Sequence, residues 1–318
     1  MIGFSSIFAP SINAMFDYRE ALGYSRNTHE ANLLAFDRYC AERGTQDILL
    51  TESLVWGWLN DLSAKKRSGM REKAASIRTF GKYLSATGQN AYVLPDGIFA
   101  AKKTLPPYIF TDKELAALFW SADNLPSSKN DSVVIIAPVL FRLIYTCGLR
   151  PNEGRELKRE NINFATGEIL ITKTKLRKER VVVMSDDMRE FCGDYDTRSK
   201  NLRSHGEFFF PFNNGNPFTS RQMNELFNRC WQWANPTVKT LPNVRVYDLR
   251  HRFASAVLNR WLDEGKDLYA MLPYLSAYMG HDKLSETAYY IHILPENLVK
   301  SAGIDWASFA ELMPEVNS

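Results

Sequence analysis

Apolar residues recur every three or four positions through the amino-terminal third of the chain, which is the spacing of helices with one buried face. Gly23 and Gly44 follow two of these stretches, and Thr51 precedes a third as a capping residue. The pattern predicts four helices, at 12–22, 28–43, 51–62 and 70–84. Together with a lysine- and proline-containing linker at 101–107, they predict a small helical domain over residues 1–105.

Helical and strand periods both appear after the linker. A capping box, Thr111 with Glu114, opens one helix, and a long apolar helix is expected to lie at the centre of the core. The helices after residue 110 are predicted near 112–119, 133–145, 219–234, 247–262 and 267–279. We therefore expect residues 106–318 to form a second domain that contains both helices and strands.

Two short β-rich runs interrupt these helices, at 168–172 and 180–184. The connection between them is strongly basic and contains Lys173, Lys175 and Arg177. A basic hairpin tip protects a strand edge from aggregation, and it is equally suited to probing DNA. The fold class is therefore α+β, mostly helical, with a small β-sheet.

Composition excludes several classes of protein. The 318 residues carry a net charge of only +3, so nucleic-acid binding would depend on local basic patches. The four cysteines are far apart and show no metal-type pairing, which favours free thiols in a reducing compartment. No apolar run is long enough to predict a membrane span, and the apolar start lacks the basic residues of a signal peptide. The expected location is the cytoplasm.

Cationic, imidazole and phenol side chains recur at short spacing between Val246 and His292. Arg250 offers a planar fork of donors to a phosphate, and we expect it in the first turn of its helix, where the backbone also favours anions. His281 follows Gly280, which fits the C-terminal cap of the preceding helix. A tyrosine hydroxyl is a possible nucleophile. The combination suits a site that holds and attacks a phosphate.

Two tyrosines compete for the nucleophile position. We expect Ser285 to cap a short helix that carries Tyr289 and Tyr290. Adjacent helical residues point about 100° apart, so only one of the two side chains faces a given pocket. The spacing within this helix leaves the choice open.

Basic residues gather elsewhere as well. The candidates for DNA contact are Lys65, Lys66, Arg67, Arg71, Lys173, Arg177 and Arg221. For the group near residue 65, a solvated helix face is the plain alternative to a surface that contacts phosphates.

Several motifs occur in a characteristic order. They are Gly-Leu-Arg-x-x-Glu at 148–153, Lys-x-x-Lys-x-Arg at 175–180, Asp-Leu-Arg-His at 248–251, Gly-His at 280–281, and a tyrosine nine residues after that histidine. Over roughly the whole chain, this ordered set resembles the tyrosine recombinase family, also called the phage integrase family. The resemblance implies a SAM-like helical core-binding domain followed by a mixed α/β catalytic domain.

The resemblance assigns roles to individual residues. Arg150 and Arg250 would clamp the scissile phosphate, and Glu153 would support the first arginine. His281 matches a histidine-or-tryptophan position that helps to offset the phosphate charge. Lys175 would protonate the leaving 5′ oxygen, since the residues after it continue as the family's hairpin usually does.

Alternatives remain for two of these roles. Lys173 is the alternative to Lys175 as the proton donor, because one register slip in the hairpin loop would exchange the two lysines. Tyr290 is favoured as the nucleophile by its interval from His281, with Tyr289 as its rival.

Tyr247 departs from the family pattern, which usually has histidine three residues before the second arginine. A phenol, with an unperturbed pKa of ~10, is a poorer general base than an imidazole. It can still donate a hydrogen bond to the phosphate or orient Tyr290. A packing role at the start of the helix is the alternative.

The implied activity is cutting and rejoining of DNA through a 3′-phosphotyrosyl intermediate, as in the integration or transposition of a mobile element. The resemblance implies no metal and no other cofactor. It implies two DNA duplexes and a homo-tetramer as partners, with accessory proteins possible, in a bacterial, nucleoid-associated setting. An amphipathic tail at 295–318 would dock on a neighbouring subunit or on its own domain.

Two other functions fit the same residues. One is a DNA-binding accessory or regulatory protein with a weakened site, which the Tyr247 departure permits. The other is a strand-breaking enzyme similar to the type IB topoisomerases, which reseals one duplex without exchanging partners.

Overall fold

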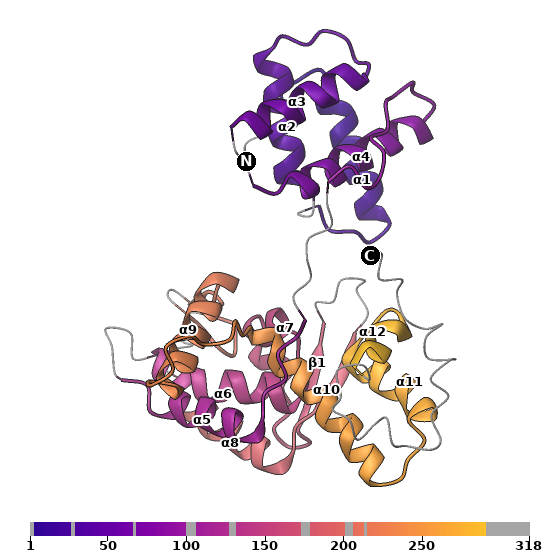
Figure 1. Ribbon diagram of the computed structural model, residues 1–318. Coiled ribbons are helices and arrows are strands. Elements are labelled where there is room, and N and C mark those ends of the chain that lie inside the picture. Colours follow the sequence, from indigo (N-terminus) through magenta and orange to yellow (C-terminus); the bar gives the residue numbers. More distant parts are fainter. Residues whose placement is uncertain are drawn as a thin grey trace. The chain divides into compact units, whose positions relative to one another are not determined.

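A computed structural model describes residues 3–26, 29–65, 68–99, 106–126, 132–172, 179–200, 206–212 and 215–290. The chain divides into two compact units, and the described residues of the first end at 99 while those of the second begin at 106. Figure 1 shows both units, and each is described separately.

Four helices pack together in the first unit, α1 (Ala9–Ala21), α2 (Glu30–Glu42), α3 (Glu52–Ala64) and α4 (Met70–Ala86). Their buried faces meet in an aromatic core, where the ring of Phe36 is tilted against that of Phe8 and edge-on to that of Trp58. The four predicted helices are therefore confirmed. The first begins earlier than predicted because Pro10 occupies its first turn, where a missing N–H costs nothing.

The second unit contains eight α-helices among its described residues, together with one 3-10 turn and two strands. The helices are α5 (Asp112–Asp123), α6 (Ser132–Thr146), α7 (Pro151–Arg155), α8 (Asp186–Arg198), α9 (Ser220–Ala234), α10 (Val246–Asp263), α11 (Leu268–Met279) and α12 (Leu284–Ala288). The 3-10 turn is η2 (Arg159–Asn161), and the strands are β1 (Glu168–Ile171) and β2 (Arg180–Val183). The mostly helical α+β prediction is confirmed.

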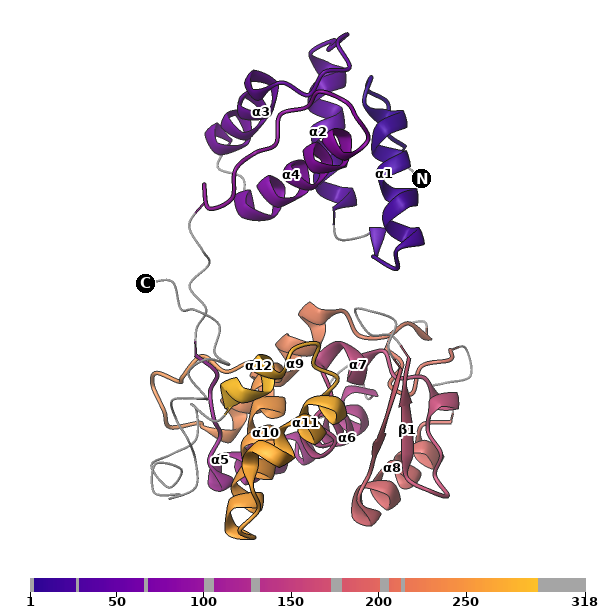
Figure 2. The same cartoon turned by 90° about the vertical axis from the view of Figure 1, so that its right-hand side faces the viewer.

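Helix α6 lies at the centre of this unit. Its apolar residues are buried or partly buried, and it packs against α5, α8, α9 and α10 (Figure 2). Helix α8 was absent from the predicted elements. Ser185 caps it, and only Met188, Cys192 and Tyr195 along its length are buried. Its many acidic residues conceal the apolar spacing.

The two strands pair antiparallel, with Ile169 opposite Val182 on the buried face. The other face of the hairpin exposes Leu170, Val181 and Val183. Strand β2 packs against α11, which places the base of the basic hairpin beside the end of that helix. The hairpin tip, 173–178, lies outside the described residues.

Helices α10, α11 and α12 share a separate apolar cluster that includes Tyr290. Helix α11 ends at Gly280, whose φ of 67° gives the left-handed cap that glycine favours. Two expectations about this region are wrong. Ser285 lies inside α12, because the extended backbone of Lys283 ends just before Leu284. Arg250 is the fifth residue of α10, beyond its first turn.

No helix in the described ranges is both long and apolar enough to cross a membrane.

Gly81, in the middle of α4, tests how tightly the first unit is packed. A Cβ atom there would lie 2.5 Å from the backbone oxygen of Tyr92, which cannot move without shifting the surrounding backbone. We expect Gly81→Ala to lower the free energy of unfolding of this unit by about 1–3 kcal/mol, although alanine is the better helix former. Hydrogen exchange of the α4 amides measures the change.

Gly57 in α3 is the matched control. A Cβ atom there meets only the hydroxyl of Tyr39, the far end of a side chain that can rotate away. Gly57→Ala should leave exchange unchanged or slow it, by up to about 1 kcal/mol of added stability. Equal exchange in the two variants would contradict the packing assigned to Gly81.

Candidate functional site

Arg150 stands between α6 and α7, where the chain turns sharply. Gly148 ends α6 with a φ of 59°, and a Cβ atom there would lie 2.4 Å from the ring of Phe253. Pro151 then begins α7 directly after Arg150. The turn is therefore available only to glycine, and it directs Arg150 toward the end of α11, where its guanidinium donates to the carbonyl of Gly280.

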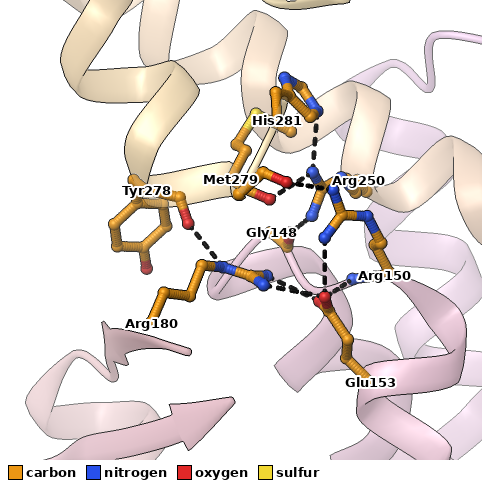
Figure 3. Close-up of polar contacts among 9 residues, drawn as sticks. Gly148, Arg150, Glu153, Arg180, Arg250, Tyr278, Met279 and His281 are labelled. Carbon is orange, nitrogen blue, oxygen red and sulfur yellow. Dashed lines mark hydrogen bonds and ion pairs between the residues drawn. The ribbon is translucent and has the colours of Figure 1, made fainter. Parts of the chain in front are cut away.

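Glu153 binds two arginines at once, as Figure 3 shows. It accepts the backbone N–H of Arg150 at 2.8 Å and the guanidinium of Arg150 at 2.9 Å. Arg180 donates to both carboxylate oxygens, at 2.8 and 2.7 Å. Burial favours the neutral acid, but these donors outweigh burial and hold the pKa of Glu153 below its ordinary value.

Arg180 also fixes the hairpin to α11. Its Nε donates to the carbonyl of Tyr278 at 2.9 Å. A Cβ atom at Gly280 would lie 3.0 Å from its Nη1, so the helix end leaves just enough room for the guanidinium. Arg180, Glu153 and Arg150 therefore form one connected group across β2, α7 and α11.

Arg250 is completely buried. One terminal nitrogen donates to the carbonyl of Gly148 and the other to that of Met279, each at 2.7 Å (Figure 3). Its Nη2 also lies 2.8 Å from Nε2 of His281. Burial lowers the pKa of Arg250, but the guanidinium stays charged because carbonyl oxygens surround it.

His281 has both ring nitrogens engaged. A guanidinium only donates, so Nε2 must accept from Arg250. Nδ1 therefore carries the proton and donates to the hydroxyl of Thr287 at 2.7 Å. Burial first, and the nearby arginines second, lower the pKa of His281 to about 3. The imidazole is neutral at physiological pH.

Tyr290, rather than Tyr289, faces this cluster. Tyr290 is 2% exposed and Tyr289 is 37% exposed. The ring of Tyr290 stacks on His281, with centroids 5.9 Å apart, and lies against His251 at 5.3 Å. Burial raises the pKa of the phenol to about 12, although the charge of Arg250 opposes this effect.

Tyr247 lies at the edge of the same group, half-buried, with its ring 5.0 Å from that of His251. It is close enough to Arg150 and Arg250 for its phenol to affect the pKa values of both arginines. The structure thus brings six sequence-predicted residues into one site: Arg150, Glu153, Tyr247, Arg250, His281 and Tyr290.

The other candidates lie elsewhere. Lys65 pairs with Asp61 at 2.8 Å, Arg221 pairs with Glu225 at 2.7 Å, and Arg71 is exposed. The remaining candidates fall outside the described residues: Lys66, Arg67, Lys173, Lys175, Arg177 and the tail at 295–318.

Sequence reasoning gave no role to Arg180, His251 or Thr287. In the sequence, Arg180 stands out only as part of a motif, because the alternation of residues along a strand does not reveal its contact with Glu153, 27 residues away. His251 follows Arg250 directly. It lies four residues after Tyr247, a spacing that places both side chains on one face of a helix and was the available signal for a role in the site.

Glu153→Gln keeps the shape of the side chain and removes the charge that two arginines share. Removing one partner of a buried ion pair leaves the other uncompensated, so we expect a loss of about 3 kcal/mol in the free energy of unfolding at neutral pH. Glu156→Gln, next to the same short helix and in a partly exposed ion pair, should cost less than about 1 kcal/mol. Urea unfolding measures both.

The effect of Glu153→Gln should also depend on pH. The pKa of Glu153 is lower in the folded state than its ordinary value of 4.5. Its stabilising contribution is therefore complete above pH 4.5 and disappears as the pH falls through the folded-state pKa. The difference between wild type and variant should shrink in acid, and a difference that persists unchanged would contradict the ion pair as its cause.

Comparisons with known proteins identify the family of the chain. A sequence model of the phage integrase family matches residues 109–297. The chain is 28% identical over 295 residues to the protein named "Putative integrase/recombinase y4rE" of Sinorhizobium fredii, and the match covers 92% of this chain and 93% of that protein. It is 30% identical over 244 residues to the tyrosine recombinase XerC of Oceanobacillus iheyensis, covering 73% and 72%.

A solved structure shares the fold. The XerH site-specific recombinase, bound to its difH substrate in a pre-cleavage complex, matches with a TM-score of 0.57 at 19% sequence identity, over 83% of this chain and 76% of that one. This likeness confirms the predicted combination of a helical amino-terminal domain with a recombinase catalytic domain. The chain belongs to the phage integrase family and is a tyrosine recombinase.

Proposed function

We propose that the cluster around Arg250 is the catalytic site of a site-specific DNA recombinase or integrase. The observation that carries the proposal is the convergence of Arg150, Arg250 and His281 on the phenol of Tyr290. Phosphodiesters resist attack because they are anionic, and fixed cations offset that charge in the transition state. The site contains a buried nucleophile beside two guanidinium groups.

The two arginines take different parts in this proposal. Arg150 is about a quarter exposed and is held from behind by Glu153, so one face of its guanidinium is available to a phosphate. Arg250 is buried and its two terminal nitrogens are bound by carbonyls, so a phosphate reaches those nitrogens only by replacing one of these acceptors. Carbonyl oxygens thus occupy both terminal nitrogens of Arg250, whereas its Nε has no partner among the described residues.

His281 changes its role when the phosphate replaces the contact between Arg250 and Nε2. An added negative charge raises the pKa of a histidine. The imidazole then gains a proton on Nε2 and donates it in a hydrogen bond to the phosphate. Thr287 continues to orient the ring through Nδ1.

Chemistry follows in two transfers. The Tyr290 oxygen attacks phosphorus, the bond to the 5′ oxygen breaks, and Lys175 protonates that oxygen. The DNA is then joined to Tyr290 through a 3′ phosphate. A 5′ hydroxyl from a partner duplex attacks in turn and releases the phenol. Lys173 is the alternative proton donor.

Double-stranded DNA is the substrate under this proposal. The first unit would bind the duplex through Lys65, Lys66, Arg67 and Arg71, and the second through Lys173, Arg177 and Arg221. Exchange between two duplexes breaks four strands, which requires four active sites and hence a homo-tetramer. The tail at 295–318 would link neighbouring subunits.

Cleavage of a nicked suicide substrate tests the nucleophile. The substrate carries a candidate site from DNA flanking the gene, so that a short strand is lost after cleavage and the adduct accumulates. We expect wild type and Tyr289→Phe to form a protein–DNA adduct that survives denaturation, since Tyr289 is exposed whereas Tyr290 is the tyrosine that stacks on His281. Tyr290→Phe should form none, because it lacks the attacking oxygen.

The outcomes separate the competing functions. An adduct that persists in Tyr290→Phe and disappears in Tyr289→Phe would reverse the assignment. Tight binding with no adduct from any of the three proteins would favour a DNA-binding accessory protein. Relaxation of a supercoiled plasmid that carries no second site would favour a topoisomerase-like enzyme.

Salt dependence tests the DNA surface of the first unit. Arg71 is exposed, whereas Arg78 donates to the carbonyls of Leu94 and Pro95 and pairs with Asp96. If Arg71 contacts a phosphate, Arg71→Gln should reduce the slope of log affinity against log salt by about 0.9. Arg78→Gln should leave the slope unchanged and weaken the fold instead. Equal slopes for wild type and Arg71→Gln would show that Arg71 does not contact a phosphate.

A further inference from the structure

Tyr247 leaves the proposed catalytic site without an imidazole at the position where related proteins usually have one. The phenol of Tyr290 must lose its proton as it attacks phosphorus. Burial raises its pKa to about 12, so the proton does not leave readily without an acceptor. Tyr247 is a second phenol and a poor acceptor. Under the proposed function, on which this role rests, a group beside Tyr290 must supply a free lone pair.

His281 does not meet this requirement. Its Nε2 lone pair accepts from Arg250 and its Nδ1 proton is donated to Thr287. After a phosphate displaces Arg250 from Nε2, His281 is needed as a donor to that phosphate. A group that donates to the phosphate cannot at the same time take the proton from Tyr290.

His251 also packs against the Tyr290 ring. Its ring centroid is 5.3 Å from that of Tyr290 and 5.0 Å from that of Tyr247. His251 is four residues after Tyr247 on α10, so both side chains occupy one face of the helix. The chain therefore places an imidazole one helical turn farther along, directly against Tyr290.

The nitrogens of His251 are less committed than those of His281. Nδ1 is buried and has no hydrogen-bond partner among the residues that the structure describes. Nε2 lies 4.0 Å from the carboxylate of Asp248, which is already bound by Arg245. A buried nitrogen without a partner is unusual, because burial removes it from water without compensation. Such a nitrogen is suited to accept a proton during a reaction.

Burial first, and the charges around it second, keep His251 neutral before DNA binds. Arg245, which caps α10, and Arg250 within that helix both oppose its protonation, and Asp248, 4.0 Å from Nε2, favours it. From the facing elements, Tyr290 packs on the ring and His281 lies close enough to interact electrostatically. A phosphate bound at Arg250 would offset the positive charge and make His251 a stronger base.

We propose that His251 is the group that accepts the phenolic proton of Tyr290. In cleavage, the Tyr290 oxygen bonds to phosphorus, its proton passes to His251, and Lys175 gives a proton to the leaving 5′ oxygen. In rejoining, the incoming 5′ hydroxyl returns its proton to Lys175, and His251 returns the other to the departing phenol. No proton is gained or lost over the full cycle.

The test uses a suicide substrate in which sulfur replaces the bridging 5′ oxygen at the cleaved bond. A thiolate leaves without being protonated, so the substrate removes the need for a general acid and keeps the need for a base. The variants are His251→Phe, which keeps a flat ring and removes both nitrogens, and Lys175→Ala. Single-turnover cleavage by the full chain is measured on the oxygen and sulfur substrates.

We expect His251→Phe to cleave both substrates about a hundredfold more slowly than wild type, the usual contribution of a proton acceptor. Lys175→Ala should be slow on the oxygen substrate and nearly normal on the sulfur one. If sulfur restores His251→Phe as well, then His251 is not the acceptor. If wild type forms no adduct with either substrate, the proposed function itself fails.

The pH dependence on the sulfur substrate distinguishes a proton acceptor from a packing residue. The wild-type rate should rise with pH and then level off once His251 is neutral. The rate of His251→Phe should rise without levelling from about pH 5 to about pH 9, because the phenol must then lose its proton to solvent. A plateau at the same pH in both proteins would overturn the proposal, whatever the size of the rate loss. A His251→Gly variant rescued by added imidazole would support it independently.

Discussion

The buried carboxylate of Glu153 is the constraint on which the site depends. Four donors from Arg150 and Arg180 surround its two oxygens, and its pKa falls although burial alone would raise it. Through these bonds, the acid fixes the turn after α6 and the start of β2. The two arginines also donate to the carbonyls of Tyr278 and Gly280, so the end of α11 is held as well. Without that negative charge, two guanidinium groups would repel each other beside a third. The acid therefore allows the protein to concentrate positive charge before any phosphate arrives.

Burial first, and that concentration of charge second, set the protonation of the two neighbouring histidines. Both His251 and His281 have pKa values well below the ordinary value of 6.5, about 4 and about 3, and the phenol of Tyr290 has a pKa of about 12. Nucleophile and imidazoles are all neutral at rest. An arriving phosphate would offset the arginine charge that, after burial, lowers the pKa values of the two histidines, whereas for Tyr290 the arginines oppose the shift that burial causes. The histidines would therefore become stronger bases when DNA occupies the site, which would link transfer of the Tyr290 proton to DNA binding.

The parts of this structure that depend on local sequence could be predicted. Thr51, Thr111 and Gly280 each set the end of a helix through bonds to residues within a few positions, and each was expected to do so. Helix α8 was not expected, because its acidic residues obscure three buried positions. Ser285 looked like a cap, but backbone geometry at Lys283 starts α12 earlier. The structural role of Arg180 follows only from its contacts with Glu153 and Tyr278, which the periodicity of the sequence does not encode.

The same distinction explains why Tyr247 was difficult to interpret from its position alone. A motif compares residues at one place in the sequence, whereas proton transfer depends on which groups touch the reacting oxygen. On a helix, a residue one turn away occupies nearly the same place in space. Tyr247 and His251 are such a pair, and their rings are in contact. A histidine missing from the motif is therefore not missing from the site, because the helix presents its imidazole to Tyr290 from the next turn.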